Sequence, residues 1–283
     1  MILIADSGST KTEWSLCNEI TLLQQFQTTG LNPFFSDEHY IADVIQKNIV
    51  SSLDINSITS VHFYGAGCLF EEQKNIVKKA CTSLFKKAAH TVESDLLGAA
   101  RALCGQEAGI ACILGTGSNS CFYDGKNIVK NISSLGYILG DEGSGAHIGK
   151  MFIRAYLRKD LPEEIQAAFF DKCKLSDEEI MHKVYHELNP NRFLSSCTRF
   201  MVNYLQNDFI SNLIKKSFSE SFTNHICKYP QHEKHLVHFT GSVAFIFKDL
   251  LSQIAAQHKV RIGNITRSPM EGLIKFHTQL KKA

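Results

Sequence analysis

The sequence has few of the residues that interrupt or crosslink a chain. Only five of its 283 residues are proline, and it contains no low-complexity tract. Its nine cysteines form no Cys-x-x-Cys pair and lie mostly in apolar segments, such as those around Cys81, Cys104 and Cys112. Because this pattern fits neither a disulfide framework nor a zinc site, we expect reduced thiols in the core and a cytoplasmic location.

Long apolar runs and an excess of charge of either sign are also missing. No segment approaches the roughly 20 apolar residues of a membrane helix, and Met1 leads directly into a strand pattern without a basic leader. The 30 basic and 28 acidic residues nearly balance and are scattered along the chain. This distribution offers no footprint for nucleic acid or an anionic membrane, so we expect a small-molecule partner.

The length and composition favour two globular domains of α/β type. Hydrophobic residues make up 44% of the chain and charged residues 20%, which is enough for a sizeable core. Short strand patterns alternate with helical ones in the first third, and a strand pattern begins again at Ile110 after the turn Gly105–Gly109. We therefore expect domains over residues 1–108 and 109–268, with a C-terminal helix in 269–283 packed on the first domain.

Two short segments indicate that the domains are duplicates. IADSGS (residues 4–9) and ILGTGS (113–118) share the pattern I-x-x-[ST]-G-S at an offset of 109 residues. Each ends one predicted strand and opens another. The matching position in the two halves predicts a repeated domain, with each copy presenting a glycine turn toward a common cleft.

The turn residues of these segments favour phosphate binding, because small residues let backbone N–H groups approach an oxyanion closely. A P-loop is excluded, since no glycine precedes Lys11 at the required spacing, and Ser120 replaces the third glycine of a dinucleotide fingerprint. The remaining interpretation is a phosphate hairpin, in which two strands are joined by a tight turn whose amides and hydroxyls hold nucleotide phosphates. Asp6 at the tip of the first strand is placed to hold Mg²⁺ directly or through water, although it could also be a simple turn former.

Several motifs, in order, resemble those of the BadF/BadG/BcrA/BcrD ATPase family and, within it, the N-acetylglucosamine kinase-like proteins of the actin-like sugar kinase superfamily. They are LIADSGSTKTEWSL, SDLLGAARAL, ILGTGSNS, LGYILGDEGSGAHIG, FTGSVA and SPMEGL, from Ile2 to about Leu273. The most specific are GTGSNS and GDEGSG. The resemblance implies two ribonuclease H-like domains with ATP and a sugar in the cleft between them.

The resemblance also implies roles for individual residues. Asp95 matches the carboxylate that takes the proton from the sugar hydroxyl, and it could also cap the helix that follows. An ordinary aspartate is ionised at pH 7 and fits the role without tuning. The implied phosphate and nucleotide contacts are Ser7, Gly8, Ser9, Thr10 and Lys11 in the first hairpin, Thr116, Gly117 and Ser118 in the second, and Gly241 and Ser242 near adenosine.

The sugar contacts implied by the family are Asn32, Asp95, Thr116, Asn119, Leu135 and Asp141. Asparagine and aspartate suit a polyhydroxyl ligand because each offers oriented hydrogen-bonding positions, yet Asn32 could be a turn former and Asp141 a helix N-cap. Two features depart from the family pattern. Ser7 and Ser9 replace glycines, and their hydroxyls could still face phosphate, while Leu135 stands where an aromatic residue often contacts the sugar.

The sequence thus predicts a kinase that uses ATP and Mg²⁺ to phosphorylate an amino sugar. The expected substrate is N-acetylglucosamine, and the alternatives are N-acetylmuramic acid and glucosamine. Two alternatives stay open: an ATPase that activates a partner enzyme through an iron–sulfur cluster, for which Cys68 and Cys104 are the nearest cysteines, and a nucleotide-gated binding protein. The oligomeric state, a homodimer included, is not determined by the sequence. The histidine-rich QHEKHLVH (231–238) lacks the spacing of a zinc motif and is expected at a solvated strand edge.

Overall fold

A computed structural model describes residues 1–8, 10–19 and 21–279 of the chain. The chain forms two compact units. Unit 1 comprises Met1–Ala108, Tyr123–Val129 and the segment from Ser268, and unit 2 comprises Gly109–Phe122 and Lys130–Arg267. The C-terminal helix therefore belongs to the same unit as the N-terminal strands, and each unit is described separately below.

Unit 1 is built around a five-stranded mixed sheet with the order β3-β2-β1-β4-β5. The central strand β1 pairs antiparallel with β2 and parallel with β4. The strands are β1 (Ile2–Ser7), β2 (Lys11–Cys17), β3 (Leu22–Thr29), β4 (Ser60–Gly65) and β5 (Ala89–Ser94).

Strand β1 is apolar along its length because both of its faces are covered. Leu3 and Ala5 belong to one buried cluster, whereas Ile2 and Ile4 belong to another, as expected for side chains that alternate across a sheet. The register places Asp6 on the Ile2–Ile4 face, at the carboxyl end of the strand. A polar side chain can be accommodated there because the apolar layer ends at that point.

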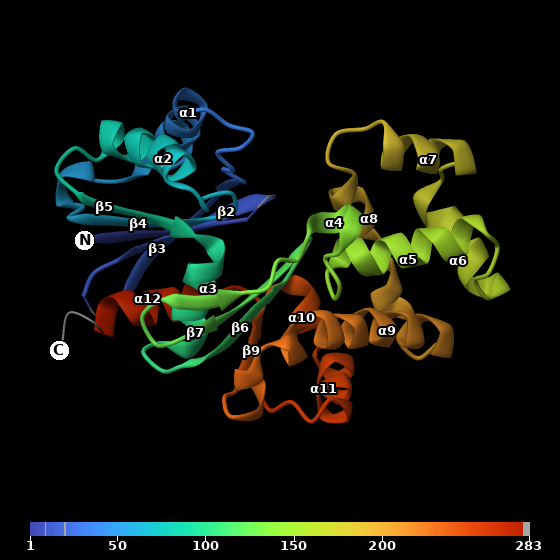
Figure 1. Cartoon of the computed structure of the whole chain (residues 1–283). Helices are drawn as coiled ribbons and strands as arrows, with labels where there is room; N and C mark the ends of the chain where they lie inside the picture. Colours follow the sequence, from blue (N-terminus) through green and yellow to red (C-terminus); the bar gives the residue numbers. More distant parts are fainter. Residues whose placement is uncertain (9, 20, 280–283) are drawn as a thin grey trace. The chain divides into compact units, whose positions relative to one another are not determined.

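The four helices of unit 1 cover the two faces in pairs (Figure 1). Helices α1 (Glu38–Asn48) and α2 (Glu71–Leu84) pack over the Leu3 face, while α3 (Asp95–Cys104) and α12 (Met270–Gln279) pack over the Ile2 face. Helices α3 and α12 approach so closely that a Cβ on Gly272 would lie 2.2 Å from the Ala102 carbonyl oxygen. His277 anchors α12 further, since its Nε2 lies 2.9 Å from the Tyr64 hydroxyl.

Unit 2 repeats the strand order of unit 1. Its sheet runs β10-β9-β6-β7-β8, so that both sheets have the order 3-2-1-4-5 when strands are numbered within their own unit. The predicted duplication is therefore confirmed at the level of topology. The strands are β6 (Gly109–Leu114), β7 (Ser118–Tyr123), β8 (Ile128–Asn131), β9 (Val237–Thr240) and β10 (Ile262–Thr266).

The helices of unit 2 surround one large apolar core. Helices α5 and α8 are in contact, and a Cβ on Gly149 of α5 would lie 1.9 Å from the Leu194 carbonyl oxygen of α8. The α-helices are α4 (Gly136–Leu139), α5 (Gly145–Leu157), α6 (Glu163–Cys173), α7 (Asp177–Tyr185), α8 (Pro190–Met201), α9 (Asp208–Asn224), α10 (Ser242–Ile246) and α11 (Lys248–Gln257).

Both units also contain short 3-10 turns. They lie at Val50–Ser52 and Ile55–Ser57 in unit 1, and at Val202–Tyr204, Ile226–Lys228 and Pro230–Glu233 in unit 2.

Local sequence signals gave most of these elements, with small errors at their ends. Helix α7 begins with a capping box at Ser176. Helix α1 is capped by Asp37, which accepts the Tyr40 N–H (2.8 Å). Strand β10 was not predicted, since Gly263 and Asn264 interrupt its short apolar pattern.

All nine cysteines are free thiols, in line with the sequence expectation. Six of them are buried, including Cys81 and Cys112, whereas Cys104 is half-buried. Over the described part of the chain, every helix is too short or too polar to cross a membrane.

The close approach of α5 to α8 yields a test of the packing in unit 2. Replacing a helical glycine by alanine ordinarily stabilises a helix, but a methyl group at Gly149 must displace the Leu194 backbone. We therefore expect Gly149→Ala to lower the free energy of unfolding by roughly 2 kcal/mol in urea titrations. Arg154→Ala, at an exposed position of the same helix, should change it little, and a Gly149→Ala protein at least as stable as the wild type would contradict this packing.

Candidate active site

The first glycine turn joins the carboxyl end of β1 to the start of β2 in unit 1. The Gly8 N–H donates to the Lys11 carbonyl oxygen (3.0 Å), which closes the turn. Ser9, predicted to contact phosphate, lies outside the described residues. Thr10 and Lys11 are exposed, and the Thr10 carbonyl oxygen accepts the Gly30 N–H (3.1 Å). The turn therefore presents its backbone, the Thr10 hydroxyl and the Lys11 ammonium to solvent.

The Ser7 side chain does not point outward with the rest of this turn. It is fully buried, and its hydroxyl lies 2.8 Å from the Thr12 hydroxyl and accepts the Leu31 N–H (3.0 Å). The expectation that this hydroxyl could face phosphate is thus wrong, because the group is engaged inside the protein. Ser7 instead ties the first turn to the segment that carries Asn32.

Lys11 is paired with Glu13, a residue that the sequence reasoning missed. The Lys11 ammonium forms an ion pair with Glu13 Oε1, and Glu13 Oε2 accepts the Ser268 hydroxyl (2.5 Å). Glu13 stands opposite Asp6 in the β1–β2 register. Counting residues back across the predicted hairpin would have found this pair, since the two strands were already identified.

Two carboxyl groups with strongly perturbed pKa values lie in unit 1. Burial, together with repulsion from Asp95 and Glu13, raises the pKa of Asp6 to about 7. Burial raises the pKa of Asp95 to about 6, although its carboxylate accepts the Leu96 N–H (2.8 Å). The expectation that Asp95 is an ordinary aspartate is therefore wrong, and its charge contributes to the raised pKa of Asp6.

Asp95 is the first residue of α3 and does not cap it. The cap is Ser94, whose hydroxyl accepts the Leu97 N–H (3.2 Å). Because the capping interaction is supplied by Ser94, the alternative that Asp95 serves only as the N-cap is excluded. A carboxylate in the first turn of a helix is stabilised by the helix dipole, and this position leaves one carboxylate oxygen for other partners.

The carboxylates of unit 1 fit the way in which proteins hold Mg²⁺. Within the described residues, no three His, Cys, Asp or Glu side chains gather into a metal-binding group. A magnesium ion that bridges phosphates is typically held by one or two carboxylates and keeps several waters. Asp6, half-buried and repelled by two other acids, is a donor that would gain from such a cation.

Asn32 is held at the surface of unit 1 by a close contact with Gly67. The Asn32 Oδ1 accepts the Phe34 N–H (2.9 Å), so the residue does form the turn suggested as an alternative. Gly67 has a φ of +86°, and a Cβ there would lie 2.2 Å from Asn32 Oδ1. Only glycine fits this position, and the Asn32 amide nitrogen remains available to a ligand.

The second glycine turn, Gly115–Gly117 in unit 2, is held by the start of α5. The N–H groups of Gly145 and Ala146 donate to the carbonyl oxygens of Gly115 (2.8 Å) and Thr116 (3.0 Å). The hydroxyls of Thr116 and Ser118 have no side-chain partner among the described residues and remain available as donors. A glycine turn fixed in this way can present N–H groups and hydroxyls to an anion.

Asp141 lies beside this turn and not at a helix cap. Its Oδ1 accepts the Ser118 N–H (3.3 Å), and a Cβ on Gly117 would lie 3.0 Å from its Oδ2. The N-cap of α5 is Ser144, so the alternative that Asp141 caps this helix is wrong. Asp141 is buried, and burial raises the pKa of its carboxyl.

The other predicted residues of unit 2 differ in exposure and in contacts. Asn119 Oδ1 accepts hydrogen bonds from the Ser120 N–H and from Asn131 Nδ2, both 2.9 Å long. Leu135 has a φ of 62° and is 63% exposed on the approach to α4. Asn131 was not predicted, because a single asparagine at a strand end carries no distinctive signal.

Gly241 packs directly on the second turn. It has a φ of +118°, and a Cβ there would lie 2.3 Å from the Leu114 carbonyl oxygen. Ser242 follows at the start of α10 and is exposed. The structure therefore brings the predicted adenosine segment against the second predicted phosphate turn.

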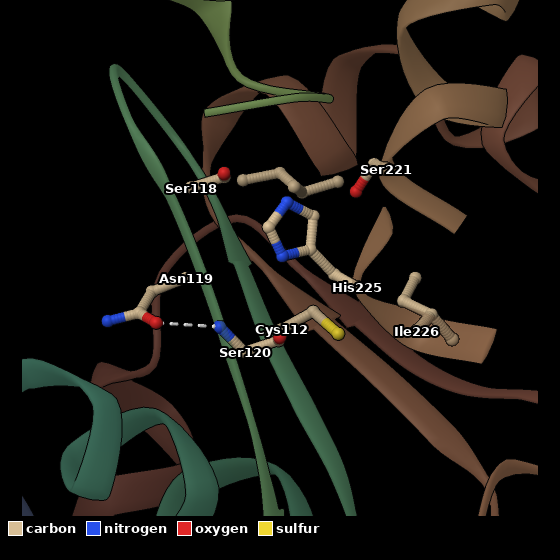
Figure 2. Close-up of a pocket in the computed structure, with 8 residues that line it drawn as sticks. Cys112, Ser118, Asn119, Ser120, Ser221, His225 and Ile226 are labelled. Carbon is tan, nitrogen blue, oxygen red and sulfur yellow. Dashed lines mark hydrogen bonds between the residues drawn. The ribbon is translucent and has the colours of Figure 1, made fainter. Parts of the chain in front are cut away.

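A small hollow in unit 2 lies next to Ser118 and Asn119 (Figure 2). It measures about 10 Å³, the space of a single water molecule. Ser221 and His225 reach it from the α9 side, and the sequence reasoning singled out neither. His225 Nε2 lies 3.0 Å from Oε2 of Glu142, in the GDEGSG segment.

The histidine-rich segment 231–238 is less exposed than predicted. His238 belongs to β9 and is buried, and its Nδ1 accepts the Asn264 N–H (3.0 Å). A Cβ on Gly263 would lie 2.4 Å from the His238 ring. The segment is thus partly core and not a solvated strand edge.

Comparison with known proteins identifies the family. No protein-family model matches the sequence. The crystal structure of a candidate N-acetylglucosamine kinase from Porphyromonas gingivalis is 41% identical to this chain and covers 99% of both chains, with a TM-score of 0.95. The chain belongs to the N-acetylglucosamine kinase-like family.

One further relative and one further solved structure are similar to this chain. An N-acetylmuramic acid/N-acetylglucosamine kinase from Clostridium acetobutylicum is 27% identical over 225 residues, which are 75% of this chain and 73% of the relative. A ROK family glucokinase from Streptomyces griseus, in complex with glucose and AMPPNP, is 12% identical over 99% of this chain and 100% of that chain, with a TM-score of 0.55. The two mixed sheets have the two-domain, actin-like sugar kinase fold that the sequence predicted.

The carboxyl groups of this family member predict an unusual dependence of stability on pH. Because Asp6 has a higher pKa in the folded protein than in the unfolded chain, the folded state binds more protons between about pH 4 and 7, and this group lowers stability as pH rises. Without ATP and Mg²⁺, we expect Asp6→Asn to be more stable than the wild type at pH 8, by about 1–2 kcal/mol or a few degrees in Tm.

Thermal denaturation at several pH values tests this expectation. The advantage of Asp6→Asn should shrink toward pH 4, where the wild-type carboxyl is protonated as well. Asp43→Asn, at an exposed carboxylate of α1, should show no comparable pH-dependent gain. A variant that is less stable than the wild type at pH 8 would show that Asp6 is not destabilised by its surroundings.

Proposed function

We propose that this protein is an ATP-dependent amino-sugar kinase, and that its first substrate is N-acetylglucosamine, phosphorylated on the 6-hydroxyl. The observation that carries the proposal is the pair Asp6 and Asp95, each half-buried and each with a raised pKa. Phosphoryl transfer to an alcohol needs a proton acceptor and a carboxylate for the metal ion. Unit 1 contains a carboxylate for each of these two roles.

Asp95 is the proposed general base. As the sugar oxygen forms its bond to the γ-phosphorus, its proton passes to the Asp95 carboxylate, and the bond from that phosphorus to the β,γ-bridging oxygen breaks to release ADP. A pKa of about 6 suits this role, because the group is mostly ionised at pH 7 yet is a stronger base than an ordinary aspartate.

The remaining groups of the two glycine turns bind the nucleotide. Thr10, Lys11, Thr116 and Ser118 offer donors to the phosphates, and the backbone at Gly8 and Gly117 allows close approach. Gly241 and Ser242 contact adenosine. Asp6 would hold Mg²⁺, which would supply positive charge to neutralise the phosphates. These assignments follow the resemblance to the BadF/BadG/BcrA/BcrD ATPases, which we propose as the wider family.

The sugar is held by amides and carboxylates that keep free hydrogen-bonding capacity. Asn32 offers its Nδ2, and Asn119 offers the amide nitrogen not used by its neighbours. Asp141 lies beside the second glycine turn, where its carboxylate can accept a sugar hydroxyl, and the exposed Leu135 gives an apolar contact. N-acetylmuramic acid is a second candidate acceptor, since the relative from Clostridium acetobutylicum is named for both sugars.

The cysteines give no support to a role as an iron–sulfur activator. Cys68 is buried, and burial together with the Asp95 charge raises the pKa of its thiol to about 12. Burial likewise raises the pKa of Cys104 to about 12. An activator would present its cluster ligands at a subunit interface, whereas Cys68 is buried and Cys104 is half-buried, which favours the kinase over the activator.

A panel of acceptor sugars tests the proposed function. With ATP and Mg²⁺, we expect ADP release with N-acetylglucosamine to exceed that with N-acetylmuramic acid, glucosamine, N-acetylmannosamine and glucose. Asp95→Asn, which keeps the shape but not the basicity, should lower kcat by at least about a hundredfold with little change in KM. No phosphorylation of any sugar would refute the function, and full activity of Asp95→Asn would refute the assigned base.

The pKa of Asp95 also predicts the pH dependence of the reaction. Protonation of the base abolishes its action, so kcat/KM should fall tenfold per pH unit below about pH 6. Initial rates between pH 4.5 and 8 with saturating ATP and Mg²⁺ measure this limb. Asp43→Asn should show the same limb as the wild type, and a rate that stays flat down to about pH 4.5 would rule out a base with a raised pKa.

A further inference from the structure

Helix α9 carries a polar stripe that faces the GDEGSG segment. The stripe consists of Ser217, Ser221 and Asn224, with His225 at the C-cap. Residues spaced by three, four and seven or eight positions lie on one face of a helix. The partners of this stripe are Glu142, Gly143 and His147, in and just after the GDEGSG segment.

Glu142 receives two partners from the end of α9, one for each carboxylate oxygen. Asn224 Nδ2 donates to Oε1 (2.9 Å), and His225 Nε2 lies 3.0 Å from Oε2. Burial works to raise the pKa of Glu142, but these hydrogen bonds outweigh it and hold the pKa below its usual range. The carboxylate is therefore ionised and fixed, with no freedom to rotate toward a ligand.

Ser217 holds the next residue of the segment. Its hydroxyl accepts the Gly143 N–H (3.1 Å) and lies 2.8 Å from His147 Nδ1. Burial lowers the pKa of His147 to about 4, so the ring is neutral, and its Nε2 faces the Glu220 carboxylate at 3.4 Å. The Nε2 therefore carries the proton, and the Ser217 hydroxyl donates to Nδ1.

Gly143 allows α9 to come this close. It has a φ of +82°, and a Cβ there would lie 3.0 Å from the Ser221 Cβ and 3.2 Å from Leu114 Cδ2. Both the backbone conformation and the space exclude a larger residue. The segment is thus clamped between α9 and the end of β6.

The clamped segment is the one that holds the second glycine turn. Asp141 precedes Glu142 directly and binds the Ser118 N–H. Two residues after Gly143, Gly145 begins the pair of N–H groups that bind the carbonyl oxygens of Gly115 and Thr116. Figure 2 shows His225 and Ser221 among the residues that line the small hollow together with Ser118. A shift of Glu142 must therefore move Asp141 and the turn together.

We propose that His225 and Asn224 are positioning residues that act through Glu142 to fix Asp141 and the second glycine turn for the sugar and the phosphates. The placement of the turn follows from the contacts above, whereas its use by sugar and ATP rests on the proposed function. Neither residue touches a reacting atom. Their effect is to remove alternative positions of the segment before the ligands bind.

Hydrogen exchange of the ligand-free protein tests the coupling directly. In His225→Leu, which lacks the hydrogen bond, we expect amides in residues 113–120 and 140–147 to exchange about tenfold faster than in the wild type. His225→Gln should restore the wild-type rates within about threefold, because its amide nitrogen can reach the position of the histidine Nε2. Asn224→Ala removes the other partner of Glu142 and, because Asn224 is half-buried whereas His225 is buried, provides a milder variant if His225→Leu does not fold.

His258→Leu is the matched control. His258 also contacts α9, with its Nε2 3.2 Å from the Ser219 hydroxyl and its ring stacked on Phe222. Among the described residues it forms no hydrogen bond or ring contact with the GDEGSG segment. It should lower the Tm without faster exchange in residues 113–120. If His225→Leu and Asn224→Ala change exchange there no more than His258→Leu does, the positioning role is wrong.

Steady-state kinetics then separate the two proposals. If the kinase assignment holds, His225→Leu should raise KM for the sugar about tenfold while His225→Gln stays near the wild type. An unchanged KM in a folded His225→Leu protein would overturn the positioning role. Faster exchange in a protein that phosphorylates no sugar would refute the kinase assignment and leave the mechanical coupling established.

Discussion

The central strands of both sheets are buried on both faces, and this constraint decides where polar groups can stand. Residues Ile2–Ala5 of β1 and Ile110–Cys112 of β6 are almost fully inaccessible. A carboxylate within these stretches would be desolvated without a partner, whichever face of the sheet it pointed to. The strand ends are the nearest positions that escape this cost, and Asp6 and Gly115 occupy the corresponding ends in the two units.

Close approach of backbone to polar side chains is the second constraint, and glycine satisfies it repeatedly. The lack of a side chain leaves room for Asn32 at Gly67, for Asp141 at Gly117 and for the Leu114 carbonyl oxygen at Gly241. Each of these contacts would be lost if a side chain were added. The glycines therefore do more than permit turns, since they set the distances between the elements from which each site is built.

The sequence was sufficient to predict the strand ends, the duplication and most elements, because these depend on local patterns of apolar and small residues. It could not predict the direction of the Ser7 hydroxyl, which is decided by Thr12 and Leu31 across the sheet. It also missed the raised pKa of Asp95, because burial is set by the packing of the whole unit. His225 was missed for a similar reason, since 83 residues separate it from Glu142.

Two kinds of carboxylate occur in this protein: Asp6 and Asp95 of unit 1 have raised pKa values, whereas Glu142 of unit 2 has a hydrogen-bond partner for each oxygen. Glu142 has a partner for each oxygen, so its charge stabilises the surrounding structure and is unavailable for chemistry. Among the described residues, Asp95 has only backbone donors for its carboxylate, and burial together with repulsion of Asp6 by Asp95 and Glu13 reduces the stability of the ligand-free protein. A site that binds a cation must leave charge uncompensated before binding, and the free energy lost in the free state is recovered only when the ligand arrives. The fully bonded Glu142 therefore supports the structure around the second glycine turn, whereas Asp6 and Asp95 carry charge that their surroundings disfavour.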